Sequence, residues 1–511
     1  MKKFIILVTI LVTNQFIFSQ NETYLPILKS QKAFSKIDFL SIGMPLSDPN
    51  MGFTGIHYNL LLNDWSYAGV GIYGAVSGNR GGFFTLGVNA GIKKELYKNI
   101  FLDTGFHFGG GGGASAPDGG GAFILPHANL TYNFHNFSLT SGWSYVNFFD
   151  GGEIKSHQLN FGLEIPLNYE YTDYSAQERV ISIHHLKNSN WYKNSNRNSL
   201  MLHLNNLSIG GDSKDSGGNK YNGETIRLAG FELTSYLNKK WFAFLKVDGA
   251  YSGIKAGYMD VFLGGGYHLS MNNNNTNILT KFAIGAGGGG GVDTKGGFLI
   301  YPDISLEQKV FEDVFISINK GFLMSPDAHF YTSTFGLGVK YYIDKNGIIS
   351  KEKTFKEGKF KGIDVIIKQD MYFNAKRDTN TKENLHQISL QINLNLNRNI
   401  YVAGQTSFAN FGNAGAYAEG IVGLGVKSMP IFNETTTIFI QALAGAAGGG
   451  GVSTGEGLII KPSIGADYKL NNNLSLRSAI GFIKAKGASE TIRSPFVNLG
   501  LKYNISFLKM K

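Results

Sequence analysis

The sequence GAGGGGGVDTKGGF, residues 285–298, places seven consecutive Gly or Ala residues before a short turn and a second pair of glycines. Gly loses more conformational entropy on folding than any other residue, so this concentration needs a structural reason. A phosphate-binding loop does not fit, because no Gly-Lys-Ser/Thr follows the run. A flexible linker does not fit either, because an apolar strand flanks each side. The stretch therefore predicts the tip of a β-hairpin.

This glycine hairpin occurs three times. FGGGGGASAPDGGGAFILPHANLTY begins at Phe108, and GAAGGGGVSTGEGLIIKPSIGADY begins at Gly445. Each copy has a glycine run, a turn, further glycine, an apolar trio and then a proline, which is Pro126, Pro302 or Pro462. The prolines are separated by whole domain lengths, so the chain is predicted to contain three homologous modules rather than short solenoid repeats.

The recurring proline predicts a bend, because proline cannot donate a hydrogen bond to the sheet. Centring the three turns predicts the cross-strand pairs Phe108–Pro126, Ala286–Pro302 and Ala446–Pro462. We expect each hairpin to curl at the outer rim or to fold toward the lumen, with glycine avoiding clashes. The alternative is that the glycines merely permit tight curvature. Neither interpretation makes them a ligand site.

Strands are predicted throughout, because apolar residues alternate with small or polar ones. In DVFLGGGYHL, from Asp260, and in FTLGVNAGIKK, from Phe84, the period is two, whereas a helix needs 3.6. About eight strands fit into each of the modules 37–168, 199–344 and 361–507. Polar linkers are expected at 169–198 and 345–360, an N-terminal segment at 21–36 and a tail at 508–511.

The N-terminus and the composition indicate an exported membrane protein. Lys2 and Lys3 precede the apolar run Phe4–Phe18, which predicts a signal peptide over residues 1–20. Charged residues make up only 16% of the chain, while it contains 67 Gly, 38 Phe and 25 Tyr and no Cys. Few charges with many aromatics and glycines favour a membrane sheet protein over a soluble one. The absence of Cys excludes a disulfide framework and a thiol nucleophile.

The alternating strands, the signal peptide and closing strands such as LGLKYNISF, which ends at Phe507, resemble bacterial outer-membrane β-barrel proteins. The modules are most similar to the small eight-stranded kind. Short turns such as LNDW alternate with longer polar loops, as in transmembrane barrels. The resemblance implies an all-β antiparallel transmembrane β-barrel of about 24 strands, located in the outer membrane.

Twenty-four strands can close once into a wide barrel or three times into eight-stranded barrels. The polar linkers and the three self-similar closing strands permit three barrels. Duplication within one barrel is an easy route to size, and tandem complete barrels are unusual. We therefore favour a single large barrel over three tandem barrels.

No catalytic or cofactor-binding residue is predicted, because H-E-x-x-H does not occur and the single G-x-S-x-G, at residues 451–455, lies in the predicted turn of a glycine hairpin rather than between a strand and a helix. The only candidate metal ligands are His107 and His127, which the hairpin register above places side by side on the inner face, with Asp103 further along. The alternative is that both histidines fill space where the other modules have smaller residues. His184 and His185, in the first linker, are expected to be solvated.

These patterns predict a non-enzymatic conduit for transport or export across the outer membrane, without cofactors. The alternative is a structural barrel that serves as an anchor or as an accessory subunit of a larger membrane complex. The expected partners are outer-membrane lipids, the barrel-assembly machinery during insertion and other subunits of such a complex. Nucleic acid is not expected, because the net charge of +10 is spread along an exported chain.

Overall fold

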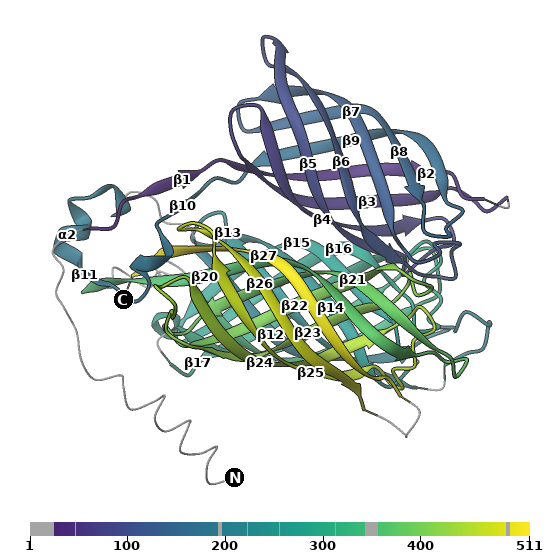
Figure 1. The fold of residues 1–511 in the computed structure, drawn as a ribbon. Coiled ribbons are helices and arrows are strands. Elements are labelled where there is room, and N and C mark those ends of the chain that lie inside the picture. Colours follow the sequence, from purple (N-terminus) through teal and green to yellow (C-terminus); the bar gives the residue numbers. More distant parts are fainter. Residues whose placement is uncertain are drawn as a thin grey trace.

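The computed structural model describes residues 25–45, 47–192, 197–221, 223–254, 256–311, 313–342, 356–486 and 491–510. The predicted signal peptide lies outside these residues. Strands make up most of the described chain (Figure 1). Among the described residues, no helix is both long and apolar enough to cross a membrane.

The strands form three separate antiparallel barrels of eight strands each. Barrel 1 consists of β2 (Ala33–Ile42), β3 (Met51–Leu61), β4 (Ser66–Ser77), β5 (Phe84–Tyr97), β6 (Ile100–Gly112), β7 (Phe123–Phe134), β8 (Phe137–Phe148) and β9 (Lys155–Pro166). Barrel 2 consists of β12 (Arg197–Gly210), β13 (Thr225–Tyr236), β14 (Trp241–Ser252), β15 (Met259–Met271), β16 (Thr276–Gly288), β17 (Phe298–Lys309), β18 (Val314–Met324) and β19 (Tyr331–Tyr342). Barrel 3 consists of β20 (Glu357–Lys376), β21 (Lys382–Asn395), β22 (Ile400–Phe411), β23 (Ala418–Lys427), β24 (Thr436–Gly448), β25 (Leu458–Lys469), β26 (Leu474–Ala485) and β27 (Arg493–Met510).

The all-β antiparallel fold and its three eight-stranded repeats are confirmed, but the preference for one large barrel is wrong. In each module the first strand pairs with the last strand of the same module, namely β2 with β9, β12 with β19 and β20 with β27. Eight strands suffice for closure when side chains fill the interior. The local alternation is the same for either closure, so it could not distinguish them.

The two faces of the barrel strands differ in polarity, as β19 shows. In β19, Phe335, Leu337 and Val339 point outward and are 48%, 50% and 54% exposed, whereas Thr334 and Lys340 point inward and are fully buried. A soluble protein would have the reverse arrangement. Apolar side chains outside and polar ones inside form the surface of a transmembrane barrel of the outer-membrane type.

Short turns and long loops lie at opposite ends of each barrel. In barrel 2 the short turns are residues 237–240, 272–275 and 310–313, and the longer connections are 211–224, 253–258, 289–297 and 325–330. The repeated Asn of the short turns has a structural role. Asn63 and Asn238 each accept hydrogen bonds at Oδ1 from two backbone N–H groups of their own turn, which satisfies donors that leave the sheet.

The remaining elements gather at the short-turn end, on the left of Figure 1. They are β1 (Lys29–Gln31), β10 (Tyr169–Tyr171), η1 (Tyr174–Ala176), β11 (Val180–Ser182), α2 (Ile183–Lys187) and η2 (Asn190–Tyr192); η3 (Asn272–Asn274) lies in a turn of barrel 2. β1 pairs with β10, and β11 adds to the start of β20. Residues 508–510, expected to be part of a tail, instead end β27 and pair with β20.

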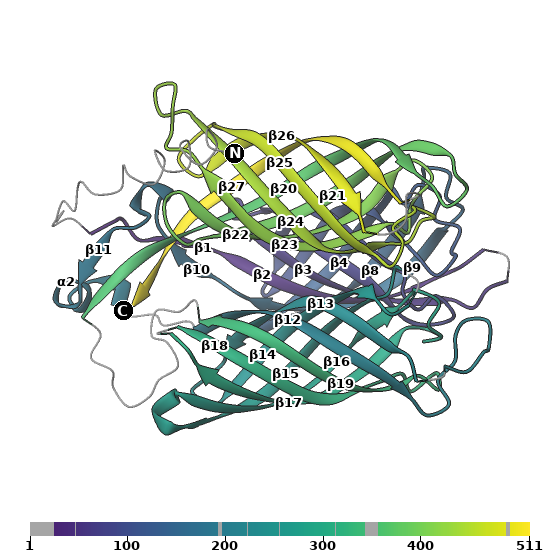
Figure 2. The same cartoon turned by 90° about the horizontal axis from the view of Figure 1, so that it is seen from below.

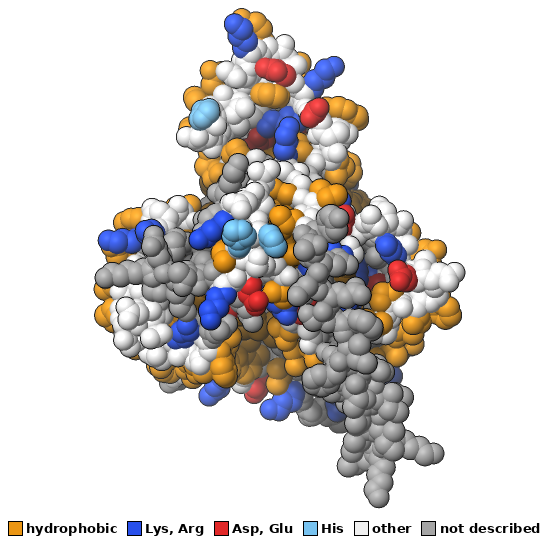
Figure 3. All heavy atoms as spheres, turned by 90° about the vertical axis from the view of Figure 1, so that its left-hand side faces the viewer, with side chains coloured by type: hydrophobic (Ala, Val, Ile, Leu, Met, Phe, Trp, Pro, Cys, Tyr) orange, Lys and Arg blue, Asp and Glu red, His pale blue; other side chains and the backbone are white. Residues whose placement is uncertain are grey.

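The three barrels lie side by side around a common centre, as the view from below shows (Figure 2). Viewed from the short-turn end, they form three lobes, with Lys and Arg side chains spread over this face among fewer acidic ones (Figure 3). The first linker and α2 therefore lie where all three barrels present their short turns.

Candidate functional site

The interior of barrel 3 contains a buried cluster of charges. Lys461 Nζ lies 2.8 Å from Asp370 Oδ2 and 3.1 Å from Glu419 Oε2, and all three side chains are at most 3% exposed. Lys461 comes from β25, and its partners come from β20 and β23, so the cluster crosses the lumen rather than linking adjacent strands. Breaking such a pair would leave an uncompensated charge in a low-dielectric interior, which is strongly unfavourable.

A second group lies nearer the short-turn end of the same barrel. Asp467 Oδ2 lies 2.7 Å from Lys502 Nζ, and Arg477 Nη1 lies 3.3 Å from Asp467. The Arg477 guanidinium also stacks 3.5 Å from the ring centre of Phe439. A planar cation held between a carboxylate and a ring closes this part of the lumen.

Barrels 1 and 2 are filled in the same way. In barrel 2, Glu232 binds Lys281 at 2.7 Å, and Glu307 binds Lys340 at 2.9 Å. In barrel 1, a network of side chains that are at most 11% exposed spans the lumen; its members are Lys36, Asp38, His57, Asp103 and His127. In each barrel, paired charges therefore close the interior at the level of these contacts.

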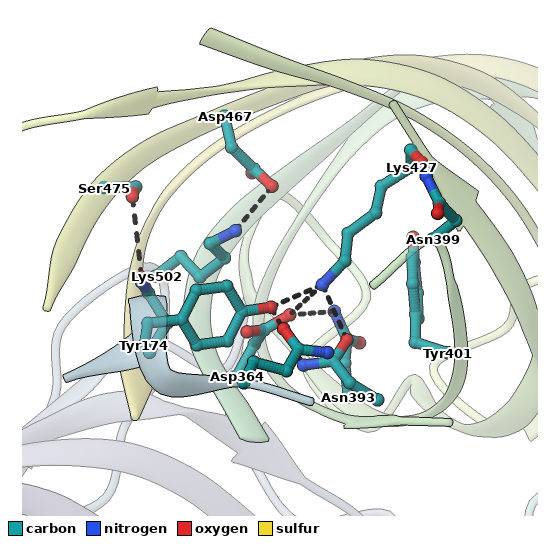
Figure 4. A network of polar contacts seen from close by, with 12 residues as sticks. Tyr174, Asp364, Asn393, Asn399, Tyr401, Lys427, Asp467, Ser475 and Lys502 are labelled. Atoms are coloured by element: carbon teal, nitrogen blue, oxygen red, sulfur yellow. Dashed lines mark hydrogen bonds and ion pairs between the residues drawn. The ribbon is translucent and has the colours of Figure 1, made fainter. Parts of the chain in front are cut away.

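The first linker inserts a tyrosine into the short-turn mouth of barrel 3 (Figure 4). The hydroxyl of Tyr174 accepts a hydrogen bond from Asn395 Nδ2 at 2.9 Å and a second from the ammonium of Lys427. The ring of Tyr174 lies 5.0 Å from Lys427 Nζ and 5.9 Å from Lys502 Nζ. The side chain therefore covers the charged group at the mouth of the barrel.

The rest of the linker anchors this tyrosine. Gln177 Nε2 donates to the carbonyl of Asn397 at 2.9 Å. Trp191 packs edge-to-face on Phe360 at 5.0 Å, within a cluster of buried apolar residues that comprises Ala176, Ile181, Leu186, Trp191, Phe360, Leu508 and Met510. We call the part of the linker that covers the mouth of barrel 3, residues 169–192, the cap. Its apolar residues are scattered among polar ones, so hydrophobic periodicity in the sequence could not reveal it. His184 and His185 lie exposed on the cap, in α2.

Each glycine hairpin packs against the next barrel in a cyclic order. The β16–β17 hairpin lies on β4 of barrel 1, the β24–β25 hairpin on β14 of barrel 2, and the β6–β7 hairpin on β22 of barrel 3. The interfaces contain the hydrogen bonds Gly81 N to Lys295 O (2.7 Å), Gly415 N to Gly119 O (3.2 Å) and Ser252 Oγ to Glu456 Oε2 (2.8 Å). A head-to-tail contact repeated three times closes a ring within one chain.

The glycines permit this contact, because added side chains would collide with the neighbouring barrel. A Cβ at Gly74 would lie 2.8 Å from Ala286 Cβ, and a Cβ at Gly249 would lie 3.0 Å from Ala446 Cβ. In the third interface, Phe408 occupies the position that Gly74 and Gly249 have in the other two. The hairpin residue equivalent to Ala286 and Ala446 is there a glycine, Gly110. Each interface thus matches a larger residue with a smaller one.

At the centre of the ring the three barrels share an apolar core. Phe84, Val261 and Phe408 come one from each barrel, and each is less than 9% exposed although it points out of its own barrel. An outward residue of an isolated barrel would contact lipid. These residues contact one another instead, which stabilises the three-barrel arrangement by burial of apolar surface.

The predicted hairpin geometry therefore needs correction. The observed cross-strand pairs are Phe106–Pro126, Phe282–Pro302 and Ala442–Pro462. The turns are centred at residues 116, 292 and 452, nearer the N-terminus than the predicted centres at 117, 294 and 454. Glycines with positive φ lie at these turns, among them Gly113, Gly289 and Gly450. The hairpins neither line a lumen nor curl at a free rim; they form the interfaces between barrels.

The two candidate metal ligands do not pair across the strands as predicted. His107 lies opposite Leu125, and His127 lies opposite Gly105. His107 Nδ1 contacts Asn89 Oδ1 at 2.5 Å, whereas His127 Nε2 lies 3.5 Å from Asp103 Oδ1. No group of three or more His, Cys, Asp or Glu side chains suited to a metal occurs in the described part of the chain. Both imidazoles belong to the polar filling of barrel 1.

One loop carboxylate lies at an interface between barrels. Asp118, in the connection between β6 and β7, accepts a hydrogen bond from Gly113 N at 2.8 Å. A Cβ at Gly415 of barrel 3 would lie 2.9 Å from Asp118 Oδ1. Burial raises the pKa of Asp118 to about 7, although this hydrogen bond and Arg80 oppose the shift.

Sequence reasoning identified the glycine hairpins but missed their partners, the buried charge clusters and the tyrosine plug. The charges at alternate positions of β20, KFKGIDVIIKQD from Lys359, were an available signal, because Asp364, Lys368 and Asp370 share one face. Their partners come from distant strands, so only the closed barrel identifies the pairs.

No protein-family model matches the sequence, and a comparison with curated protein sequences finds no match. Among solved structures, the chain is similar to OpdQ of Pseudomonas aeruginosa at 8% identity, over 93% of this chain and 98% of that chain, with a TM-score of 0.22. It is also similar to a variant of the ferric enterobactin receptor PfeA of the same organism, at 10% identity over 93% and 80% of the two chains, with a TM-score of 0.28. OccK11 (OpdR) of that organism matches at 10% identity over 94% and 96%, with a TM-score of 0.21.

The predicted class of protein is confirmed by the three closed barrels and their apolar outer faces. The chain therefore has the fold of a transmembrane β-barrel protein, in which three small barrels are joined into a ring.

Proposed function

We propose that the protein is a non-enzymatic structural component of the outer membrane, which uses its ring of three barrels as an anchor for a larger complex. The observation that carries the proposal is the filling of all three interiors by buried ion pairs, such as Lys461 with Asp370 and Glu419. A static conduit needs a continuous hydrated path, and eight-stranded barrels leave little space beyond their side chains.

The capped end supports an anchoring role. The linker between barrels 1 and 2 crosses to barrel 3 and forms the cap there, so the short-turn end presents one composite surface. His184 and His185 are exposed on this surface, in α2. A partner that binds the cap would be fixed relative to all three barrels, because the glycine interfaces hold the ring together.

Transport remains the second candidate, and the polar interior is the observation in its favour, since polar interiors also line conducting barrels. Conduction through barrel 3 would require the ion pairs of Lys461 and the Tyr174 plug to separate. The two functions therefore predict different behaviour in a membrane.

The test is single-channel recording of the purified protein in planar bilayers, with insertion verified by protease protection in liposomes made from the same sample. An anchor is expected to insert without conductance steps. Stable conductance that rises when Lys461 and Arg477 are both replaced by Gly would favour the conduit and contradict the anchor.

A further inference from the structure

A cavity of about 550 Å³ lies between barrels 2 and 3, on the short-turn side of the glycine hairpins. Its wall consists mainly of outward-facing residues of β12–β14 and β22–β24, including Leu204, Phe231, Val247, Thr406 and Val422. We infer that this cavity binds one acyl chain of a membrane phospholipid. The inference goes beyond the anchoring function, because the site would be occupied whether or not a partner protein binds.

The cavity exists because barrel 3 has small residues where the other barrels have large ones. Strand register makes three sets of outward positions equivalent: Gly420 corresponds to Leu86 and Val261, Gly404 to Val70 and Leu245, and Ala444 to Phe108 and Ile284. All three small residues line the cavity. Each removes volume that would otherwise fill the gap between barrels 2 and 3.

The backbone does not require glycine at these positions. A Cβ at Gly420 would meet no atom within 4 Å, and a Cβ at Gly404 would meet only Val422 Cγ1, at 3.9 Å. Neither glycine has a positive φ. This distinguishes them from the interface glycines, such as Gly448, where a Cβ would lie 2.5 Å from the backbone N of Gly257. The small residues at 404 and 420 therefore leave space rather than allow close backbone contact.

The position of the cavity indicates which kind of molecule can enter it. Its end at the long-loop side is covered by glycines of the hairpins and loops, namely Gly82, Gly112, Gly257 and Gly448. Toward the short-turn side, Leu204, Leu337 and Val339 are half exposed and continue into the lipid-facing surface of barrel 2. The site is therefore open to the hydrocarbon layer, from which a lipid chain can enter with its head group on the short-turn side.

The chemistry of the wall also favours a hydrocarbon chain. His203 and Asp248 belong to wall strands, but their side chains are buried inside barrel 2 and pair with each other at 2.5 Å. An apolar cavity of this kind does not stabilise water. An added polypeptide segment would need hydrogen-bond partners for its backbone in the hydrocarbon region, whereas an acyl chain needs none.

The experiment measures phospholipid retention by native mass spectrometry. The wild-type protein, Gly420→Leu, Ala444→Ile and the control Gly265→Leu are delipidated in detergent, incubated with palmitoyl-oleoyl phosphatidylethanolamine and activated to remove weakly held lipid. Leu and Ile already occur at the equivalent positions of other barrels, as Leu86 and Ile284, so both substitutions suit the fold. Gly265 also points outward but lies outside the cavity wall, and barrel 3 has a leucine at the equivalent position.

We expect the wild type and Gly265→Leu to retain one tightly bound phospholipid, and the two cavity-filling variants to retain it at least tenfold less. Folding of each variant is verified by its heat-dependent mobility in gels. If one cavity-filling variant fails to fold, the lipid retention of the other is compared with that of the wild type and the control. Equal retention by all four proteins would overturn the inference. So would a bound polypeptide mass in the wild type that disappears from the cavity variants.

Discussion

Substitution of Gly110 by Val should push barrel 1 away from barrel 3. Gly110 lies on β6 and faces β22, where its added Cβ would lie 2.4 Å from the carbonyl O of Ala409 and 2.6 Å from Asn410 Cβ. Ordinary contacts of this kind are 3.4–4 Å long, so the two backbones would have to separate by about 1 Å. Overpacking of this kind costs about 1–3 kcal/mol.

The separation can be measured with spin labels, because the chain has no Cys and labels can be placed at will. His135 in barrel 1 and Asn471 in barrel 3 are exposed residues of short turns, so cysteines there report on the relative position of the two barrels. In Gly110→Val we expect a longer or broader distance distribution by pulsed electron paramagnetic resonance, together with a lower thermal midpoint.

Gly265→Val is the matched control. Its Cβ would point to lipid, with Phe242 O at 3.4 Å as the nearest atom. The control should preserve the distance between barrels, because no neighbouring barrel faces it. If Gly110→Val keeps both the distance distribution and the unfolding free energy of the wild type, the glycines do not act by allowing close approach, and the reasoning is refuted.

Three further predictions concern the interior, the loops and the cap. Lys461→Met should lower the free energy of unfolding in urea by about 3–5 kcal/mol, because Asp370 and Glu419 lose their buried cation; a loss below about 1 kcal/mol would contradict a role in stability. Since burial raises the pKa of Asp118 to about 7, its stabilising contribution is fully present below about pH 4 and is lost as the pH rises through 7. Thermal midpoints measured from pH 4 to 8 should fall less steeply in Asp118→Asn, and parallel curves would exclude this carboxyl. Tyr174→Ala should free the cap, so trypsin should cut the linker at residues 169–192 faster than in the wild type while the barrels stay intact; unchanged cleavage would show that the plug does not hold the linker.

The sequence by itself determined the strands, the three modules and the membrane-facing surface. Side-chain alternation is local, since neighbouring residues of a strand point to opposite faces, so segments such as DVFLGGGYHL reveal both strand and polarity. The repeated glycine hairpin likewise predicted a turn with close backbone contact. What the hairpin contacts is not local information, because the same glycines would serve a curled rim.

Only the tertiary structure decided closure and assembly. Whether β20 pairs with β27 or with a strand of another module depends on residues more than a hundred positions apart, and the alternation pattern is the same in both cases. The ion pairs of Lys461 and the plug of Tyr174 arise from that closure, because a lumen brings distant strands within reach of one another. The cyclic packing of glycine hairpins then follows from fitting three convex barrels together, which needs surfaces without side chains at the points of closest approach.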